Sequence, residues 1–502
     1  MRKLTAAAAC ALVALTIAGP AGADLAIGVA DDAGKDALDG GASRFFPTMV
    51  QAGLQENAIT VRWDPANPNS LSEKVILDRV IPQALAHGIR PILVVEPNNP
   101  ITIAHSPALT ATFGLFLQQI AHTYPRVKDY VIGNEPNQPR FWRPQFDADG
   151  SPVAGAAYET LLAAGYDFLK AADPSIRVIG LALSNHGNDD YKAKSNVSTS
   201  PVRFIQQVGS AYRASGRKRP LMDAVAMHPY PNLSTDSLTQ GIPWPNVGVA
   251  NLDRFKQAIW DAFHGTAQRT IEQGLPIRIT EVGWQVGVPQ PFSYAYTGRE
   301  NVATTDEATQ STIYTQLLQL LACDPSVQDV LFFHLIDESP LEGYQSGLVR
   351  ADWSQRPSFS AVHDLITQTA GRCQGALVPW HHSTSVIGAS ARIGTLGRSV
   401  PVVVNADESV RVVAAIVRVP RRGSISPAAV AQRLANGNEP QVNNVRLLSS
   451  RAYWKTTVRV PLAGLLPGSY VVAVQVAAEL APGRTTIFLG PRFSTPVFRV
   501  IG

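Results

Sequence analysis

The sequence of 502 residues has few cysteines and little charge of either sign. It contains three Cys, and Asp, Glu, Lys and Arg together make up 16% of the residues. Basic residues do not form a dense run, since Arg217-Lys218-Arg219 is only a short cluster. These shortages exclude a metal site built from paired Cys-x-x-Cys motifs, and they argue against nucleic acid as a partner.

Several motifs of common enzyme chemistries are also absent. The sequence has no His-Glu-x-x-His metal motif, no glycine-rich phosphate loop and no Gly-x-Ser-x-Gly nucleophile elbow. Its ten His are scattered along the chain. We therefore expect an activity that uses neither a metal nor an organic cofactor.

Beyond its first residues the sequence has no apolar run long enough to span a membrane. At the start, Arg2-Lys3 precedes an apolar stretch at 4–18, and Ala21-Gly22-Ala23 follows as a cleavage site. This layout predicts a secretory signal peptide over residues 1–23, and hence a secreted protein that starts at Asp24. A membrane anchor is the alternative, but the stretch is short for a bilayer. Cleavage would leave 41 of the 43 basic residues against 39 acidic ones, a net charge of +2.

Strand-like and helix-like runs alternate over residues 24–375, which predicts an α/β fold with a parallel sheet. Several strand runs are almost entirely apolar, as expected for strands that are covered on both faces. Eight strands with helices between them correspond to a closed (β/α)₈ TIM barrel. An open doubly wound sheet is the alternative, but no glycine-rich loop follows the first strand run. The predicted strands are residues 25–30, 58–63, 91–96, 130–135, 177–183, 224–228, 276–281 and 330–336.

The pattern changes after Cys373. Short β-rich runs, separated by turn-forming residues, replace the alternation of strands and helices. They predict a small antiparallel β-sandwich domain over residues 376–502. Carbohydrate binding and simple packing on the barrel are the alternatives for this domain, and we expect packing, because aromatic residues that look exposed do not cluster in it. The runs are residues 399–404, 410–417, 456–460, 470–476 and 485–489.

The cysteines that remain after signal cleavage predict a disulfide. Cys10 would leave with the signal peptide, and an exported chain would keep the pair Cys323 and Cys373. Two buried thiols that never meet are the alternative. Cys323 closes the helix before the eighth strand, and Cys373 follows the helix after it. Both should therefore lie at the N-terminal face of the barrel, away from the catalytic face.

Two predicted strands end in a glutamate. The fourth ends in Gly-Asn-Glu-Pro-Asn with Glu135, and the seventh ends in Ile-Thr-Glu-Val-Gly-Trp with Glu281. Reactive groups of such barrels lie at the C-terminal ends of the strands. Two carboxyl groups in different environments can cleave a glycosidic bond, because one donates a proton and the other attacks the anomeric carbon. A lone glutamate at a strand end is usually a solvated cap, so the indication comes from the pair.

Five segments resemble the clan A glycoside hydrolases, most closely bacterial members of the family 39 and family 5 type. The resemblance as a whole covers most of residues 24–373. The segments are VIGNEPN, AAYETLLAAGYDFLKAADPSIRVIG, DAVAMHPYP, PIRITEVGW and VLFFHLIDE. The resemblance implies a TIM barrel and a retaining mechanism, with the acid/base on strand four and the nucleophile on strand seven.

The resemblance implies a role for four residues. Glu135 would be the general acid/base, and Glu281 would be the nucleophile that forms a covalent glycosyl intermediate. Asn134 would bind the sugar hydroxyl next to the reacting carbon. Arg62 resembles the strand-two arginine that keeps the nucleophile ionised, which predicts a lowered pKa for Glu281. A surface salt bridge is the alternative for Arg62.

Strands six and eight add further residues. His228 and Tyr230 resemble the pair that hydrogen-bonds around the nucleophile, with a structural histidine as the alternative. Strand eight departs from the clan, in which many members place a Trp under the sugar. Here Phe333 or His334 would take that place, which puts the shape of the innermost sugar pocket in doubt.

Four more residues near the strand ends are candidates for substrate binding. Sugar rings pack their C–H faces on aromatic side chains, so tryptophans in these loops are candidate platforms. Polar side chains at the strand ends are candidates for binding hydroxyl groups. Ordinary packing and a plain polar rim are the alternatives. The candidates are Trp284, Trp142, Glu96 and Asn185.

The activity implied is hydrolysis of the O-glycosidic bonds of a poly- or oligosaccharide, with carbohydrate as the partner. A transglycosylase would share the mechanism and differ only in the acceptor of the intermediate. A non-catalytic glycan-binding protein on the same scaffold is the alternative from another class, and loss of either glutamate would favour it. The sugar, the linkage, exo or endo action and the oligomeric state stay open.

Overall fold

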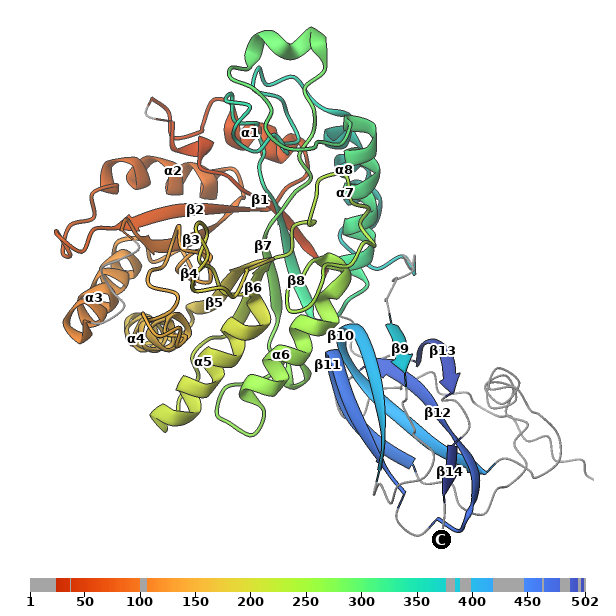
Figure 1. The fold of residues 1–502 in the computed structure, drawn as a ribbon. Helices are drawn as coiled ribbons and strands as arrows, with labels where there is room; N and C mark the ends of the chain where they lie inside the picture. The colour runs from red at the N-terminus through yellow and green to blue at the C-terminus, as the bar shows by residue number, and fades with distance from the viewer. Residues whose placement is uncertain are drawn as a thin grey trace, which may run out of the picture.

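A computed structural model describes residues 24–36, 38–99, 106–375, 384–388, 399–418, 447–462, 465–478, 488–494 and 498–500 (Figure 1). The predicted signal peptide, residues 1–23, lies outside the described residues. Within them, no helix is sufficiently long and apolar to cross a membrane.

Eight parallel strands close into a barrel, which confirms the predicted fold. Each strand pairs with its neighbour in chain order, and β1 also pairs with β8. The strands are β1 Ala26–Ala30, β2 Glu56–Trp63, β3 Arg90–Pro97, β4 Asp129–Ile132, β5 Arg177–Ser184, β6 Ala224–His228, β7 Ile277–Val282 and β8 Val327–Phe332.

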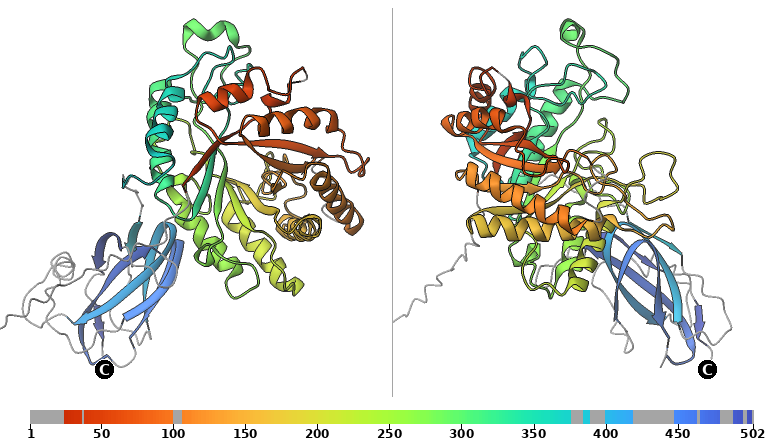
Figure 2. Two further views of the ribbon diagram at one scale, coloured as in Figure 1. Left: turned by 180° about the vertical axis from the view of Figure 1, so that it is seen from behind. Right: turned by 90° about the vertical axis from the view of Figure 1, so that its left-hand side faces the viewer.

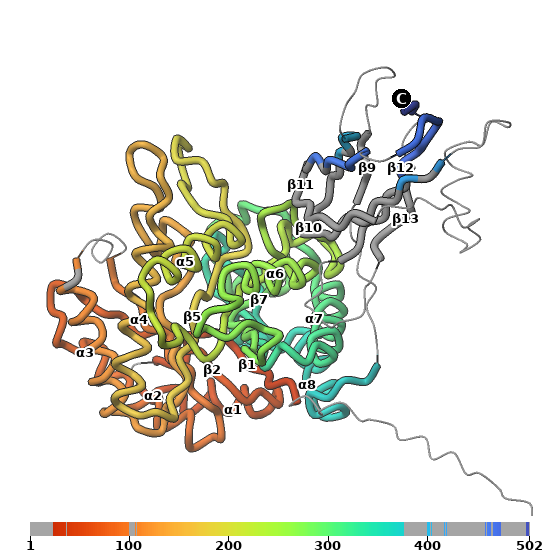
Figure 3. Tube along the Cα trace, turned by 90° about the horizontal axis from the view of Figure 1, so that it is seen from below, coloured from red at the N-terminus to blue at the C-terminus, as the bar shows by residue number. Residues whose placement is uncertain are grey.

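Helices connect the strands and lie around them (Figures 2 and 3). The longest is α4, Ala154–Ala172, which ends before Asp173-Pro174. Short 3₁₀ helices occur at Ala33–Lys35, Val249–Asn251, Ile271–Gln273 and Gln290–Ala295. The other helices are α1 Phe45–Gln51, α2 Lys74–Ala86, α3 Pro107–Thr123, α5 Pro201–Ser215, α6 Leu252–Phe263, α7 Glu307–Ala322 and α8 Pro357–Thr369.

Alternate strand residues point into the barrel, as the pleat of a strand requires. A layer of small and branched side chains fills its middle, while the larger core lies between the strands and the helices. This layer separates the two ends of the barrel. It consists of Ala30, Ala58, Ile92, Val131, Ile179, Ala182, Ala224, Ala226 and Leu331.

Strands β4 and β8 end earlier than the sequence predicted. The backbone leaves β4 at Gly133, whose φ of 76° is left-handed. After β8, the backbone N–H groups of Leu335 and Ile336 donate to the carboxylate of Asp31, at 2.9 and 3.1 Å, rather than to a neighbouring strand. Both departures lie at the end of the barrel where the glutamates are found.

The disulfide between Cys323 and Cys373 is present, with Cα atoms 4.6 Å apart. It joins the C-terminal end of α7 to the segment after α8, as expected. Nearby, the backbone N–H of Leu25 donates to the carbonyl oxygen of Gly371 at 3.0 Å. The beginning and the end of the barrel therefore meet at its N-terminal face.

The strands after the barrel form one hydrogen-bonded antiparallel sheet. The long β10, Ser399–Arg418, pairs with β11, Leu447–Pro461, and β12, Gly468–Ala478. The short strands β9, Thr384–Gly388, β13, Phe488–Ser494, and β14, Phe498–Val500, pair with β10 or β12. Among the described residues after 375 the regular elements are all strands, as predicted, whereas the second layer of a sandwich and the boundary at 375/376 stay predictions.

Candidate active site

The backbone after β4 turns sharply and aims Glu135 into the barrel mouth. Gly133 and Glu135 have positive φ angles of 76° and 37°, a region that residues with a side chain rarely adopt. The backbone N–H of Glu135 donates to the carbonyl oxygen of Ala182 at 2.9 Å, which fastens the turn to β5. The hydroxyl of buried Tyr158 also links the two strands, through backbone hydrogen bonds of 2.7 and 2.8 Å.

Glu281 is the penultimate residue of β7. The pairing of β7 with β8 shifts register between Ile279 and Val282, which re-aims the side chains at the end of the strand. The Glu281 side chain is 18% exposed. The hydroxyl of Tyr230, two residues after β6, donates to Glu281 Oε2 at 2.9 Å. The strand-six tyrosine therefore contacts the expected nucleophile.

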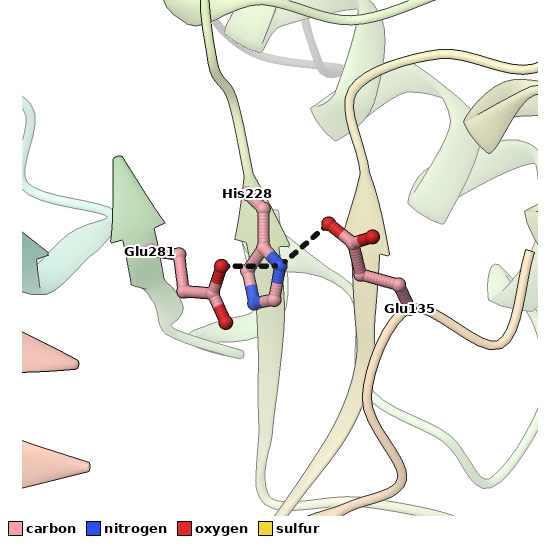
Figure 4. A group of neighbouring side chains, drawn as sticks. All are labelled: Glu135, His228 and Glu281. Atoms are coloured by element: carbon pink, nitrogen blue, oxygen red, sulfur yellow. Dashed lines mark hydrogen bonds and ion pairs between the residues drawn. The ribbon is translucent and has the colours of Figure 1, made fainter. Parts of the chain in front are cut away.

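His228 lies between the two glutamates (Figure 4). Its Nδ1 is 3.1 Å from Glu135 Oε1 and 3.6 Å from Glu281 Oε2. Its Nε2 is 2.9 Å from the hydroxyl oxygen of Thr280, and the ring is almost completely buried. One carboxyl oxygen of Glu135, one of Glu281 and a ring nitrogen of His228 all lie within 4.8 Å of one another.

The charges in this group affect one another. Burial raises the pKa of Glu281, and the charge of Glu135 adds to the effect, whereas His228 and the Tyr230 hydroxyl oppose it. Burial would lower the pKa of His228, but the carboxyl groups of Glu281 and Glu135 outweigh burial and raise it. Burial and Glu281 raise the pKa of Tyr230 well above its ordinary value, so its hydroxyl keeps the proton that it donates.

The prediction of a lowered pKa for Glu281 is therefore wrong, and the position of Arg62 explains why. Arg62 belongs to the inward-facing residues of β2, but its guanidinium pairs with Glu96, with Nε 3.7 Å from Oε1. Its side chain is 62% exposed. The nucleophile candidate thus has a buried histidine and a tyrosine as neighbours instead of an arginine.

The other candidate substrate-binding residues differ in position, since some lie at the barrel mouth and others are packed in the core around it. Trp284 and Trp142 are 1% and 3% exposed, so both rings are buried, and their role as sugar platforms stays a prediction. Trp284 donates its indole N–H to the carbonyl oxygen of Asp236 at 2.9 Å, and Trp142 packs edge-on against Tyr158. The sequence alone does not distinguish an aromatic residue after a strand that faces the mouth from one that faces the outer core.

Asn185 and Asn134 take different positions. Asn185 is buried, and its amide donates to the carbonyl oxygen of Tyr230 at 3.0 Å, which ties the loops after β5 and β6 together. Its Oδ1 is 2.6 Å from Nδ1 of His186. The contacts place Asn185 as a brace of the loops. Asn134 is half-buried and immediately precedes Glu135.

Two further aromatic rings surround Tyr230. The half-buried Phe333 follows β8, and its ring centre lies 6.1 Å from that of Tyr230. Tyr344 lies 5.5 Å from Tyr230, and its hydroxyl donates to the carbonyl oxygen of Gly283 at 3.0 Å. Phe333 thus stands beside Tyr230, whereas His334 is largely buried. Sequence analysis missed Tyr344, because nothing in its loop marks it.

The group Glu135, His228 and Glu281 also has the ligand types of a metal site. Both glutamates, however, already have a hydrogen-bonding neighbour within the group or in Tyr230. Nδ1 of His228 and Oε1 of Glu135 are 3.1 Å apart, and at this distance their lone pairs would repel each other unless a proton lay between them. A shared proton therefore explains this contact as well as a metal ion would. The geometry accounts for a proton-sharing group without a metal ion.

Comparisons with known proteins give distant similarities. No protein-family model and no curated protein matches the chain. Among solved structures, a family 39 glycoside hydrolase from the gut symbiont Bacteroides cellulosilyticus WH2 has 17% identity and a TM-score of 0.48, over 80% of this chain and 74% of its own. A β-xylosidase from Caulobacter crescentus CB15 has 16% identity and a TM-score of 0.45, over 88% and 93%.

A family 39 enzyme from Xanthomonas axonopodis pv. citri has 15% identity and a TM-score of 0.45, over 88% of this chain and 91% of its own. Similarity at this level does not assign an activity to the chain.

Proposed function

We propose that this protein is a secreted retaining glycoside hydrolase that cleaves O-glycosidic bonds of a poly- or oligosaccharide. One observation carries the proposal: carboxyl oxygens of Glu135 and Glu281 lie within 4.8 Å of each other across the barrel mouth. Retaining enzymes hold the two carboxyl groups about 5–5.5 Å apart, whereas inverting enzymes need about 6.5–9.5 Å to admit a water molecule. The gap fits direct attack by a carboxylate.

In the first step, Glu281 attacks the anomeric carbon, and the bond to the leaving oxygen breaks as that oxygen takes a proton from Glu135. In the second step, Glu135 takes a proton from water, whose oxygen replaces Glu281 on the sugar. The Tyr230 hydroxyl orients the attacking carboxylate. His228 shares one proton with Glu135 through the contact of its Nδ1 with Oε1, so the general acid lies next to a proton source.

The two catalytic glutamates also argue for catalysis rather than glycan binding alone. Both side chains are partly exposed, at 16% and 18%, whereas His228 between them is buried. Two carboxyl groups held on either side of one buried histidine are not needed in a protein that only binds sugar. Transglycosylation would use the same residues and differ in whether a sugar or water accepts the intermediate.

Secretion is part of the proposal. The leader-like layout of residues 1–23 supports it, and so does the disulfide between Cys323 and Cys373, since disulfides persist in oxidising compartments. Intact mass of the exported protein would show loss of residues 1–23. A chain that keeps its first residues, stays in the cytosol and has free thiols at Cys323 and Cys373 that can be alkylated without reductant would contradict this part.

A panel of aryl glycosides and polysaccharides would identify the substrate and test the mechanism. We expect the first product to keep the anomeric configuration of the substrate by NMR. An activated fluorosugar should add its mass to the peptide that carries Glu281. A Glu135→Gln variant should retain more activity on aryl glycosides with good leaving groups than on natural linkages. An inverted first product would overturn the retaining mechanism.

A further inference from the structure

Glu96 lies at the mouth of the barrel without a role in the two-step chemistry. It is the penultimate residue of β3 and pairs in register with Arg62 of β2. Ile92 and Val94 precede it at alternate positions and belong to the interior of the barrel. The strand pleat therefore directs the Glu96 side chain inward, above the apolar layer, on the same level as the catalytic groups.

The carboxyl group of Glu96 is buried with few partners. Its side chain is only 9% exposed, and Arg62 contributes a single ion-pair contact of 3.7 Å to Oε1. Oε2 is fully buried and has no hydrogen-bond partner. A buried carboxylate normally accepts several hydrogen bonds, so this environment favours the neutral acid.

Charged groups on three sides act on Glu96. Burial is the main cause that raises its pKa to about 7, Glu281 on β7 and Asp32 after β1 add to the shift, and Arg62 on β2 opposes it. Glu96 and Glu281 are the penultimate residues of β3 and β7, so both border the space at the mouth of the barrel. A sugar whose anomeric carbon meets Glu281 would occupy that space.

We propose that Glu96 is a specificity-determining residue that donates a hydrogen bond from its neutral carboxyl group to one hydroxyl group of the glycosyl unit held at Glu281. The proposal rests on the function proposed above. A carboxylate only accepts hydrogen bonds and the Arg62 guanidinium only donates them, whereas a carboxylic acid does both, as a sugar hydroxyl does. A site of this kind rejects an analogue that lacks the hydroxyl, because the buried acid is then left without a partner.

The test compares KM and kcat of two variants on an aryl glycoside that the wild-type protein cleaves. In the wild type, KM should rise as the pH passes about 7, the value to which the pKa of Glu96 is raised. Glu96→Gln keeps the shape and a donor, so its KM should stay near the low-pH value and lose that rise. Glu96→Leu should raise KM at every pH, about five- to tenfold for one lost hydrogen bond.

Two further measurements sharpen the test. Asp32→Asn removes a charge that raises the pKa of Glu96, so the rise of KM should move to lower pH. Deoxy analogues of the aryl glycoside should show one position at which the wild type loses affinity and Glu96→Leu does not.

Glu96→Gln keeps the test valid even where Glu96→Leu misfolds. A rise of KM through pH 7 that persists in Glu96→Gln would overturn the proposal, as would equal discrimination of every deoxy analogue by wild type and variants. Failure of the proposed function would look different, since Glu281→Gln would then keep full activity. A wild-type protein that cleaves no glycoside would overturn both.

Discussion

The two ends of the barrel both contain clusters of buried ionisable side chains, but they differ in how completely cationic side chains pair with the carboxyl groups. At the N-terminal end, fully buried Arg278 reaches Asp129, with Nη1 2.6 Å from Oδ1, and it also bonds to Asp329. Arg177 pairs with Asp129 as well, and Arg90 contacts Glu56. Each of these acidic residues has an arginine partner.

At the C-terminal end, the carboxyl groups outnumber their cationic partners. Glu135 and Glu281 share one histidine, and Glu96 has a single arginine at 3.7 Å. The apolar layer in between keeps the two clusters apart. The comparison shows that the same residue types can hold a fold together or perform chemistry, depending on whether opposite charges neutralise them.

The largest effect should come from replacing the candidate nucleophile. We expect Glu281→Gln to lower kcat/KM by roughly 10³-fold or more, because the attacking carboxylate is lost. Its melting temperature should not fall, since the change removes a charge from a crowded group of carboxyls. Steady-state kinetics and calorimetry would show both. A Glu281→Gln variant with a lower melting temperature and unchanged activity would show that this carboxyl group stabilises the fold instead of performing chemistry.

At the opposite end, Arg278→Leu should affect stability rather than chemistry. It leaves the buried carboxyl groups of Asp129 and Asp329 without their shared partner, which should cost about 3–5 kcal/mol of unfolding free energy. Arg177→Leu is the matched control, because Arg177 is partly exposed and should cost less. Urea denaturation measures both. Equal losses in the two variants would show that burial of the arginine does not decide the effect.

The disulfide should also act on stability alone. Replacing Cys323 and Cys373 with serine removes a link across 50 residues, which the chain-entropy account values at up to about 4 kcal/mol. Because the bond lies at the N-terminal face, kcat and KM should not change at a temperature where the variant is folded. A change in KM at that temperature would mean that the last β/α unit transmits strain to the mouth.

The smallest effect should come from removing metal ions. Glu135, His228 and Glu281 form a possible ligand set, but hydrogen bonds already account for their positions. Dialysis against EDTA should leave activity within error of the untreated protein, and added Zn²⁺ or Mn²⁺ should not increase it. Loss of activity that is restored by one of these ions would instead show that Glu135, His228 and Glu281 bind a catalytic metal ion.

The sequence predicted the features that depend on strand periodicity and on strand ends. The eight strands and the two glutamates were visible because apolar runs lead directly to Glu135 and Glu281. The partner of Arg62 was not visible, because strand alternation directs the side chain inward without selecting between Glu96 and Glu281. The burial of Trp284 was hidden as well, since the register shift in β7 changes which residues face the mouth.

The hydrogen bond between Leu25 and Gly371 has a consequence for engineering. It places the two ends of the barrel segment side by side at the N-terminal face, so a short linker could join them. New ends could then be opened in a surface loop between other β/α units, as circular permutation requires. Such a permuted barrel would keep every strand pair while changing which unit the ribosome makes first.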